Sequence, residues 1–342
     1  MKEKNTAIEY LKIASIYAIV LCHFAGKGGF DILNIGDTVN KYYLTMLYLG
    51  GNLGVSCFVI VTGYFSYNNK YINIKKVVLI SIKTLFFSIV LFMGFCLIND
   101  GRVEIDIPIL LRTFLPIIFN AYWYITTYVV LLVFIPFLNK IGKDLTKRDF
   151  IILLGAGVAT TFLLPMFTGN SSLFSTIGWF FLLYMTGFFL KQYNYRKCIF
   201  ACTAILSFLA IFLSTVIGHG FKLFSPRFFM EQQSVLVYLL AVGLFGLFIN
   251  KKTLNSNMLI KYLGSGTLGV YLLHVHPLYK NFIWTDLLNV TRLVESKWLI
   301  PYSVLVCFAI VVIGSGLDAL YEKTIGSILA KKMPNCLVFI EK

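Results

Sequence analysis

The chain has 342 residues, of which 58% are hydrophobic and only 13% are charged. A soluble domain of this length needs more polar residues to cover its surface, so the composition excludes a soluble globular protein. The net charge of +15 does not indicate nucleic acid as a partner, because the basic residues form short clusters between apolar segments, where they set membrane orientation.

Apolar stretches follow one another along the whole chain, and a bilayer span needs roughly 20 such residues. We therefore expect an all-α polytopic membrane protein, with one transmembrane domain over 1–342 and no additional soluble domain. About ten spans are expected, at residues 7–25, 46–66, 78–98, 121–138, 150–166, 177–190, 198–217, 233–250, 262–279 and 298–317. The segment 108–119 is too short to cross and is expected to form an interfacial or re-entrant helix.

The distribution of charge predicts the orientation of these spans. If both termini lie in the cytosol, that side holds 21 basic and seven acidic residues, and the outer side holds nine basic and eight acidic residues. This excess of Lys and Arg follows the positive-inside rule. The seven cysteines fall mostly inside apolar spans and lack zinc-ligand spacing, so we expect them to be packing residues and expect no metal site.

The first predicted span carries three ionisable residues on one face. Lys12 and His23 are 11 residues apart, which places them within about 20° of one angular position and ~16 Å apart along a helix. Glu9 precedes Lys12 by three residues, a spacing that allows an ion pair. Lys12 alone is explained by a lysine reaching for the interface, and His23 alone by a hydrogen bond to a neighbouring helix. Their shared face favours a functional role for both.

The ninth predicted span contains a second group of polar residues. Tyr271 and His274 are three residues apart and share one helix face, whereas His276 points elsewhere and Pro277 loosens the helix. A hydrogen bond that only stabilises the fold explains either histidine equally well, and His276 is the more dispensable of the two.

Three further features bear on a binding site. Trp123 and Tyr124 open the fourth span at the outer interface, where aromatic belts form. Arg227 is an outer-loop cation that suits either lipid headgroups or an anionic glycan lipid. Small residues at 50–54 and at Gly63 favour close helix packing, with space for a thin ligand between the first two spans as the alternative.

Several motifs occur in a fixed order along nearly the whole chain. They are Lys12 and His23 in the first span, Gly-Val-Ser-Cys-Phe-Val-Ile-Val-Thr-Gly-Tyr-Phe at 54–65, Trp-Tyr-Ile at 123–125, Pro-Phe-Leu-Asn at 136–139, and Leu-Gly-Val-Tyr-Leu-Leu-His at 268–274 with Trp284 downstream. Together they resemble the membrane acyltransferase family 3, and within it the bacterial polysaccharide O-acetyltransferases. Many members carry Arg where this chain has Lys12, so a bidentate phosphate clamp is not expected here.

The resemblance implies a multi-pass protein of the bacterial inner or plasma membrane. It implies that acetyl groups pass from cytosolic acetyl-CoA, the acyl-donor co-substrate, to hydroxyls of a cell-surface polysaccharide or its lipid-linked precursor. Membrane lipid is an expected partner, and polysaccharide-assembly proteins are candidate partners. The expected site residues are His23 and His274 for catalysis, Lys12 and Glu9 for donor binding, and Trp123, Tyr124, Arg227, Tyr271 and His276 for substrate binding.

The resulting hypothesis places the donor phosphates near Lys12 and the thioester near His23. His23 then acts as general base toward a sugar hydroxyl or is transiently acetylated, and His274 orients or replaces it. Two alternatives remain. One is a flippase or exporter component for an undecaprenyl-linked sugar or a polysaccharide, because polar residues in spans also suit a transport path. The other is a scaffold in a polysaccharide-assembly complex.

Overall fold

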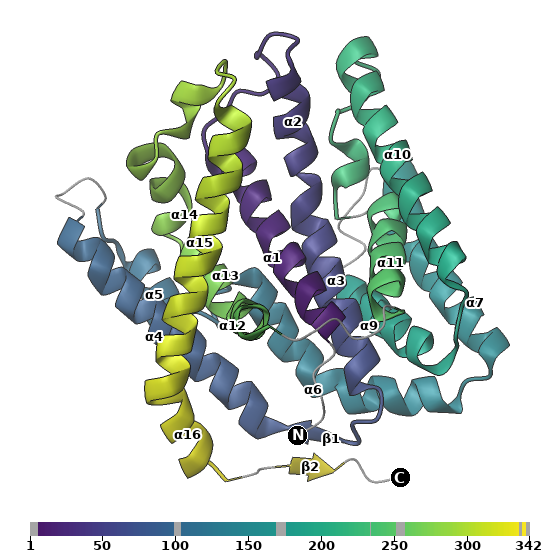
Figure 1. The fold of residues 1–342 in the computed structure, drawn as a ribbon. Coiled ribbons are helices and arrows are strands. Elements are labelled where there is room, and N and C mark those ends of the chain that lie inside the picture. The colour runs from purple at the N-terminus through teal and green to yellow at the C-terminus, as the bar shows by residue number, and fades with distance from the viewer. Residues whose placement is uncertain are drawn as a thin grey trace.

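The computed structural model describes residues 6–98, 104–168, 176–232, 234–250, 257–334 and 337–339. Long helices run through the molecule, with α1 (Thr6–Lys27) and α3 (Leu49–Ser66) in the middle of the bundle (Figure 1). In the same view α4 (Ile74–Ile98) and α15 (Leu299–Tyr321) lie toward one side, and α7 (Lys147–Val158) and α10 (Lys197–Phe221) lie toward the other.

The remaining elements complete the helical bundle. The α-helices are α2 (Val39–Leu47), α5 (Ile107–Phe114), α6 (Trp123–Asp144), α8 (Leu164–Thr168), α9 (Thr176–Gln192), α11 (Val235–Ile249), α12 (Met258–Ser265), α13 (Thr267–Val275), α14 (Tyr279–Phe282) and α16 (Ser327–Lys332). Short π or 3-10 turns are η1 (Ala159–Leu163), η3 (Phe228–Met230), η4 (Ile283–Leu287), η5 (Val290–Leu293) and η6 (Glu322–Gly326). Two short strands, β1 (Tyr71–Asn73) and β2 (Leu337–Phe339), pair antiparallel.

Six helical segments of the described chain are long and apolar enough to cross a membrane. They are Thr6–Lys27, Val39–Ser66, Ile74–Ile98, Trp123–Asp144, Lys197–Phe221 and Leu299–Lys332. These findings confirm an α-helical multi-pass protein. The other four predicted spans coincide with shorter helices: α7 to α8, α9, α11, and the pair α12 and α13. The number of about ten spans stays a prediction.

The pairing of β1 with β2 bears on the orientation of the chain. Two candidate spans, α1 and the run from α2 to α3, separate the N-terminal end of α1 from β1. If each crosses once, β1 lies on the N-terminal side of the membrane, and β2 near the other end of the chain is held there with it. This arrangement agrees with an even number of crossings, and the assignment of that side to the cytosol stays a prediction.

Large apolar side chains cover the outer helices, as expected for contact with lipid. Leu97 of α4, Leu206 of α10 and Leu305 of α15 are all more than half exposed. The segment predicted to be interfacial contains α5, an eight-residue helix whose first turn is capped because Asp106 accepts a hydrogen bond from the Ile109 N–H at 2.9 Å. Its length does not allow a crossing.

Glycines bring the central helices into backbone contact. A Cβ atom at Gly54 would lie 2.6 Å from the Ser15 carbonyl oxygen of α1, and one at Gly50 would overlap the Ala18 carbonyl oxygen. Gly63 of α3 and Gly187 of α9 are in the same relation to the backbone of the partner helix. The prediction of close packing is confirmed. The alternative of a space for a thin ligand between the first two spans stays a prediction, because α1 and α3 also line a common cavity beside these contacts.

The contact at Gly63 yields a stability prediction. We expect Gly63→Ala to lower the free energy of unfolding by about 1–3 kcal/mol, because the added methyl group overlaps the Tyr184 carbonyl and forces α3 and α9 apart. Gly155→Ala in α7 is the matched control, because no atom lies within 4 Å of its added Cβ. Thermal unfolding of purified protein in detergent measures both changes. Equal midpoints for the two variants would contradict the packing role of Gly63.

Candidate functional site

The polar face of α1 turns toward the interior of the bundle. Lys12, Ile16 and Ile19 all line one cavity, and their spacing places them on a single face of the helix. His23 is the next residue on this face. Its Nδ1 atom is buried and has no hydrogen-bond partner among the residues that the structure describes. The face that carries Lys12 therefore lines a cavity, and His23 continues this face beyond the lining residues.

The cavity has a volume of about 360 Å³ and is lined by six helices: α1, α3, α4, α6, α12 and α13. Two lysines line it, Lys12 and Lys76. Lys76 is in the first turn of α4, directly after β1, so it marks the end of the cavity nearest the strand pair (Figure 1). Its Nζ atom lies 5.7 Å from the centre of the Tyr128 ring. A pair of cations thus faces the interior from one side of the membrane.

Glu9 forms the predicted ion pair with Lys12. The Glu9 carboxylate lies 2.8 Å from the Lys12 Nζ, and the side chains are 8% and 22% exposed respectively. Gly264 of α12 packs directly against this carboxylate, leaving no room for a side chain there. The buried acid therefore compensates Lys12, while the lysine still reaches the cavity.

A second helix brings His274 to His23. The ring centres of the two histidines are 5.0 Å apart, with 46° between the ring planes. The Nδ1 of His274 lies 2.6 Å from the Val270 carbonyl oxygen. Because a carbonyl only accepts, Nδ1 of the neutral ring carries the hydrogen and Nε2 keeps its lone pair. That Nε2 is buried and has no partner in the described part of the chain, so it is available as a base.

The local sequence explains how α13 presents this histidine. Gly266 separates α12 from α13, and α13 ends at Val275 because His276 precedes Pro277 and adopts an extended backbone with φ −49° and ψ 133°. Pro277 thus ends the helix after the turn that holds His274, whereas the sequence indicated only a loosened helix.

Two tyrosines lie between the cavity and the histidine pair. Tyr124 and Tyr271 both line the cavity, and their ring centres are 5.5 Å apart. The backbone N–H of Tyr124 donates to the Tyr271 hydroxyl at 3.4 Å, and the ring of Tyr271 is 6.2 Å from that of His274. Tyr271 therefore connects the wall of the cavity to the imidazoles.

Three predicted substrate-binding residues lie elsewhere. Trp123 packs edge-on against Phe180, and the guanidinium of Arg227 lies 4.3 Å from the centre of the Tyr48 ring. His276 is 1% exposed, its Nε2 donates to the Ser88 carbonyl, and its Nδ1 accepts from the Leu278 N–H, both at 3.2 Å. None of these three is among the described residues that line the cavity.

Lys76 is a cavity residue that sequence reasoning did not single out. It follows Lys75 at the start of a span, where a basic pair is expected merely to orient the helix, so no signal in the sequence sets it apart. Within the described ranges, no three His, Cys, Asp or Glu side chains form a group that could hold a metal ion.

Comparison with known proteins adds one finding to this geometry. A family model described as an acyltransferase domain matches residues 5–317. No curated protein and no solved structure matches the chain. The matched region includes α1, α13 and all six helices around the cavity. Because the match spans nearly the whole chain, the protein belongs to the acyltransferase family 3 and is a multi-pass membrane acyltransferase.

Proposed function

We propose that this acyltransferase moves the acetyl group of cytosolic acetyl-CoA to hydroxyls of a cell-surface polysaccharide or its lipid-linked precursor in a bacterial plasma membrane. The observation that carries the proposal is a cavity lined by two lysines, with the His23–His274 pair next to its lining residue Tyr271. Donor binding and chemistry are thereby separated along the membrane normal, as transfer across a bilayer requires.

The donor enters from the lysine end. Lys12 and Lys76 bind its phosphates by charge-assisted hydrogen bonds, and Glu9 neutralises Lys12 when no donor is present. The pantetheine arm extends along the face of α1 that carries Ile16 and Ile19. The rise from Lys12 to His23 is ~16 Å, comparable to the length of that arm. The thioester then lies next to the tyrosines and the histidine pair.

The histidines supply the base for acyl transfer. A hydroxyl oxygen of the acceptor attacks the thioester carbonyl carbon, and its proton passes to the lone pair on His274 Nε2 or His23 Nδ1. The carbon–sulfur bond breaks as the ester forms. The imidazolium then returns the proton to the departing thiolate, so the products are an acetyl ester and free CoA. Both imidazoles end the cycle neutral.

The acceptor approaches from the opposite end of α1. Tyr124 and Tyr271 contact the acyl group, whereas Trp123 and Arg227 act on the acceptor from outside the described cavity. His276 supports them indirectly, because its two ring nitrogens hold the turn after α13. Cations gather on this side: burial, Lys27 and Arg112 together lower the pKa of Lys280, which follows the turn after α13. These three cations form a local group, which favours an acceptor with anionic groups, such as a phosphate-linked lipid glycan. Polysaccharide-assembly proteins are proposed suppliers of this acceptor.

Membership of an acyltransferase family gives no support to the alternative of a flippase or exporter component. The scaffold alternative has no observation in its favour either, because a structural role does not need two buried imidazole nitrogens without partners.

The histidine pair can be tested by substitution. We expect His23→Ala and His274→Ala each to lower acyl transfer by about 10²–10⁴-fold, since each removes a group placed for proton transfer. His219→Ala is the control, because His219 lies on α10 and bonds Thr45 instead. The O-acetyl content of surface polysaccharide is measured in cells with matched protein levels. Normal O-acetylation by either variant would remove that histidine from the mechanism.

Donor binding can be tested by thermal stability. Acetyl-CoA should raise the unfolding temperature of the purified protein. At a donor concentration of 100 times its Kd, binding adds about 2.7 kcal/mol to the free energy of unfolding. Lys12→Ala and Lys76→Ala should each weaken binding by about ten-fold or more, because a hydrogen bond to a charged group contributes about 1.5–3 kcal/mol.

Lys75→Ala is the matched control, since the Lys75 Nζ donates to the Met333 carbonyl at 2.9 Å and does not line the cavity. Equal weakening by Lys75→Ala would indicate a general effect of charge. No stabilisation of the wild-type protein at any donor concentration would count against the acetyltransferase and in favour of a transporter.

A further inference from the structure

Lys83 places a charge inside a membrane-spanning helix, away from the candidate active site. It is the tenth residue of α4, ~14 Å along the helix from the first. Its side chain is only 8% exposed. An ammonium group in such a position is unfavourable unless it is paired, so its partners indicate why it is there.

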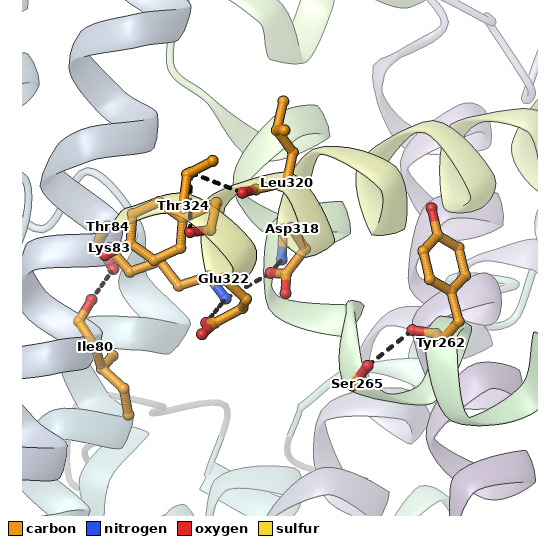
Figure 2. Close-up of polar contacts among 11 residues, drawn as sticks. Ile80, Lys83, Thr84, Tyr262, Ser265, Asp318, Leu320, Glu322 and Thr324 are labelled. Atoms are coloured by element: carbon orange, nitrogen blue, oxygen red, sulfur yellow. Dashed lines mark hydrogen bonds and ion pairs between the residues drawn. The ribbon is translucent and has the colours of Figure 1, made fainter. Parts of the chain in front are cut away.

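The partners come from the end of α15 and the turn after it (Figure 2). The Lys83 Nζ lies 2.7 Å from Asp318 Oδ1 and 2.8 Å from Glu322 Oε1. The two acids differ in their surroundings, because the Asp318 side chain is 3% exposed and that of Glu322 is 54% exposed. Asp318 is therefore the buried counter-ion of Lys83, and Glu322 is a partner at the surface.

Asp318 also holds the beginning of α13. Its Oδ1 accepts a hydrogen bond of 2.8 Å from the backbone N–H of Gly269, the third residue of that helix. The residue before α13 is Gly266, which has no side chain to cap the first turn. The Asp318 carboxylate of α15 thus caps the first turn of α13 from a neighbouring helix. Its negative charge is also stabilised by the positive end of the dipole of α13.

The backbones of α13 and α15 touch around this bond. A Cβ atom at Gly269 would lie 2.6 Å from the Asp318 Cβ, and one at Gly314 would lie 2.5 Å from the Val270 Cα. Such contact fixes the distance between the helices, and the bond from the Tyr124 N–H to the Tyr271 hydroxyl holds a later turn of α13. The hydrogen bond from Gly269 to Asp318 restrains the rotation of α13 at its first turn.

The rotation of α13 decides where its catalytic side chain points. His274 is five residues beyond Gly269, ~7.5 Å along the same helix, and its ring is bonded within the helix to Val270. The imidazole therefore moves with α13 as a unit. Neither Lys83 nor Asp318 is among the described residues that line the cavity, so their charges do not contact the donor there.

We infer that Lys83 and Asp318 form a positioning pair, which locks the rotation of α13 and so holds His274 against His23. This role rests on the proposed function for its effect on rate. Lys83 keeps the Asp318 carboxylate in place, Asp318 holds the Gly269 N–H, and α13 transmits that position to the imidazole.

The test compares two double variants that both lack the buried charges. Lys83→Met/Asp318→Asn keeps an oxygen that accepts from Gly269, and Lys83→Met/Asp318→Ala does not. We expect the Ala variant to lose at least ten-fold more kcat than the Asn variant, with KM for acetyl-CoA within two-fold in both. Glu322→Gln is the control and should keep kcat within two-fold of the wild type.

A second readout does not depend on activity. Diethyl pyrocarbonate labels histidines, and mass spectrometry gives the rate at each one. His274 should react at least five-fold faster in the Ala variant than in the Asn variant, while His219 on α10 serves as an internal reference. Equal rates at His274 in both variants, or equal kcat values, would overturn the positioning role. An inactive wild-type protein with the expected labelling difference would instead count against the proposed function alone.

Discussion

The contact between the imidazoles of His23 and His274 joins two helices that are about 250 residues apart in the chain, at a ring separation of 5.0 Å. The close packing of α1, α3, α13 and α15 is what holds these rings together. Glycines bring α3 against α1 and α13 against α15, and these contacts fix the two helices that carry the imidazoles. In the proposed mechanism, a shift of about 1 Å in either helix would separate the base from the acceptor hydroxyl.

The described helices contain two different kinds of ion pair. Glu9 and Lys12 are three residues apart on one helix, and the pair opens onto the cavity. Lys83 and Asp318 come from different helices, and the pair is closed. The open pair leaves Lys12 in the lining of the cavity, whereas the closed pair joins α4 to α15. Sequence spacing reveals the first kind, because both members lie on one helix.

The sequence alone predicts pairs of residues within one helix better than pairs that come from two helices. The helical period was enough to align Lys12 with His23, and motif resemblance pointed to His274 on a second helix. Lys76 and Lys83 could not be predicted, since a lysine near the beginning of a span looks like an orientation signal whether it faces solvent, a cavity or a buried acid. Helix ends were also hard to place, because Gly266 divides one predicted span into α12 and α13.

The position of α1 has a consequence for how the protein is made. The groups that cover its polar face, including Gly264 of α12 and His274 of α13, are synthesised more than 230 residues after it. Until α12 and α13 are synthesised, the imidazole of His23 can contact only lipid or helices that are already present. The neighbouring acid already neutralises Lys12 within the same helix, which lowers the cost of inserting α1 before its final partners arrive.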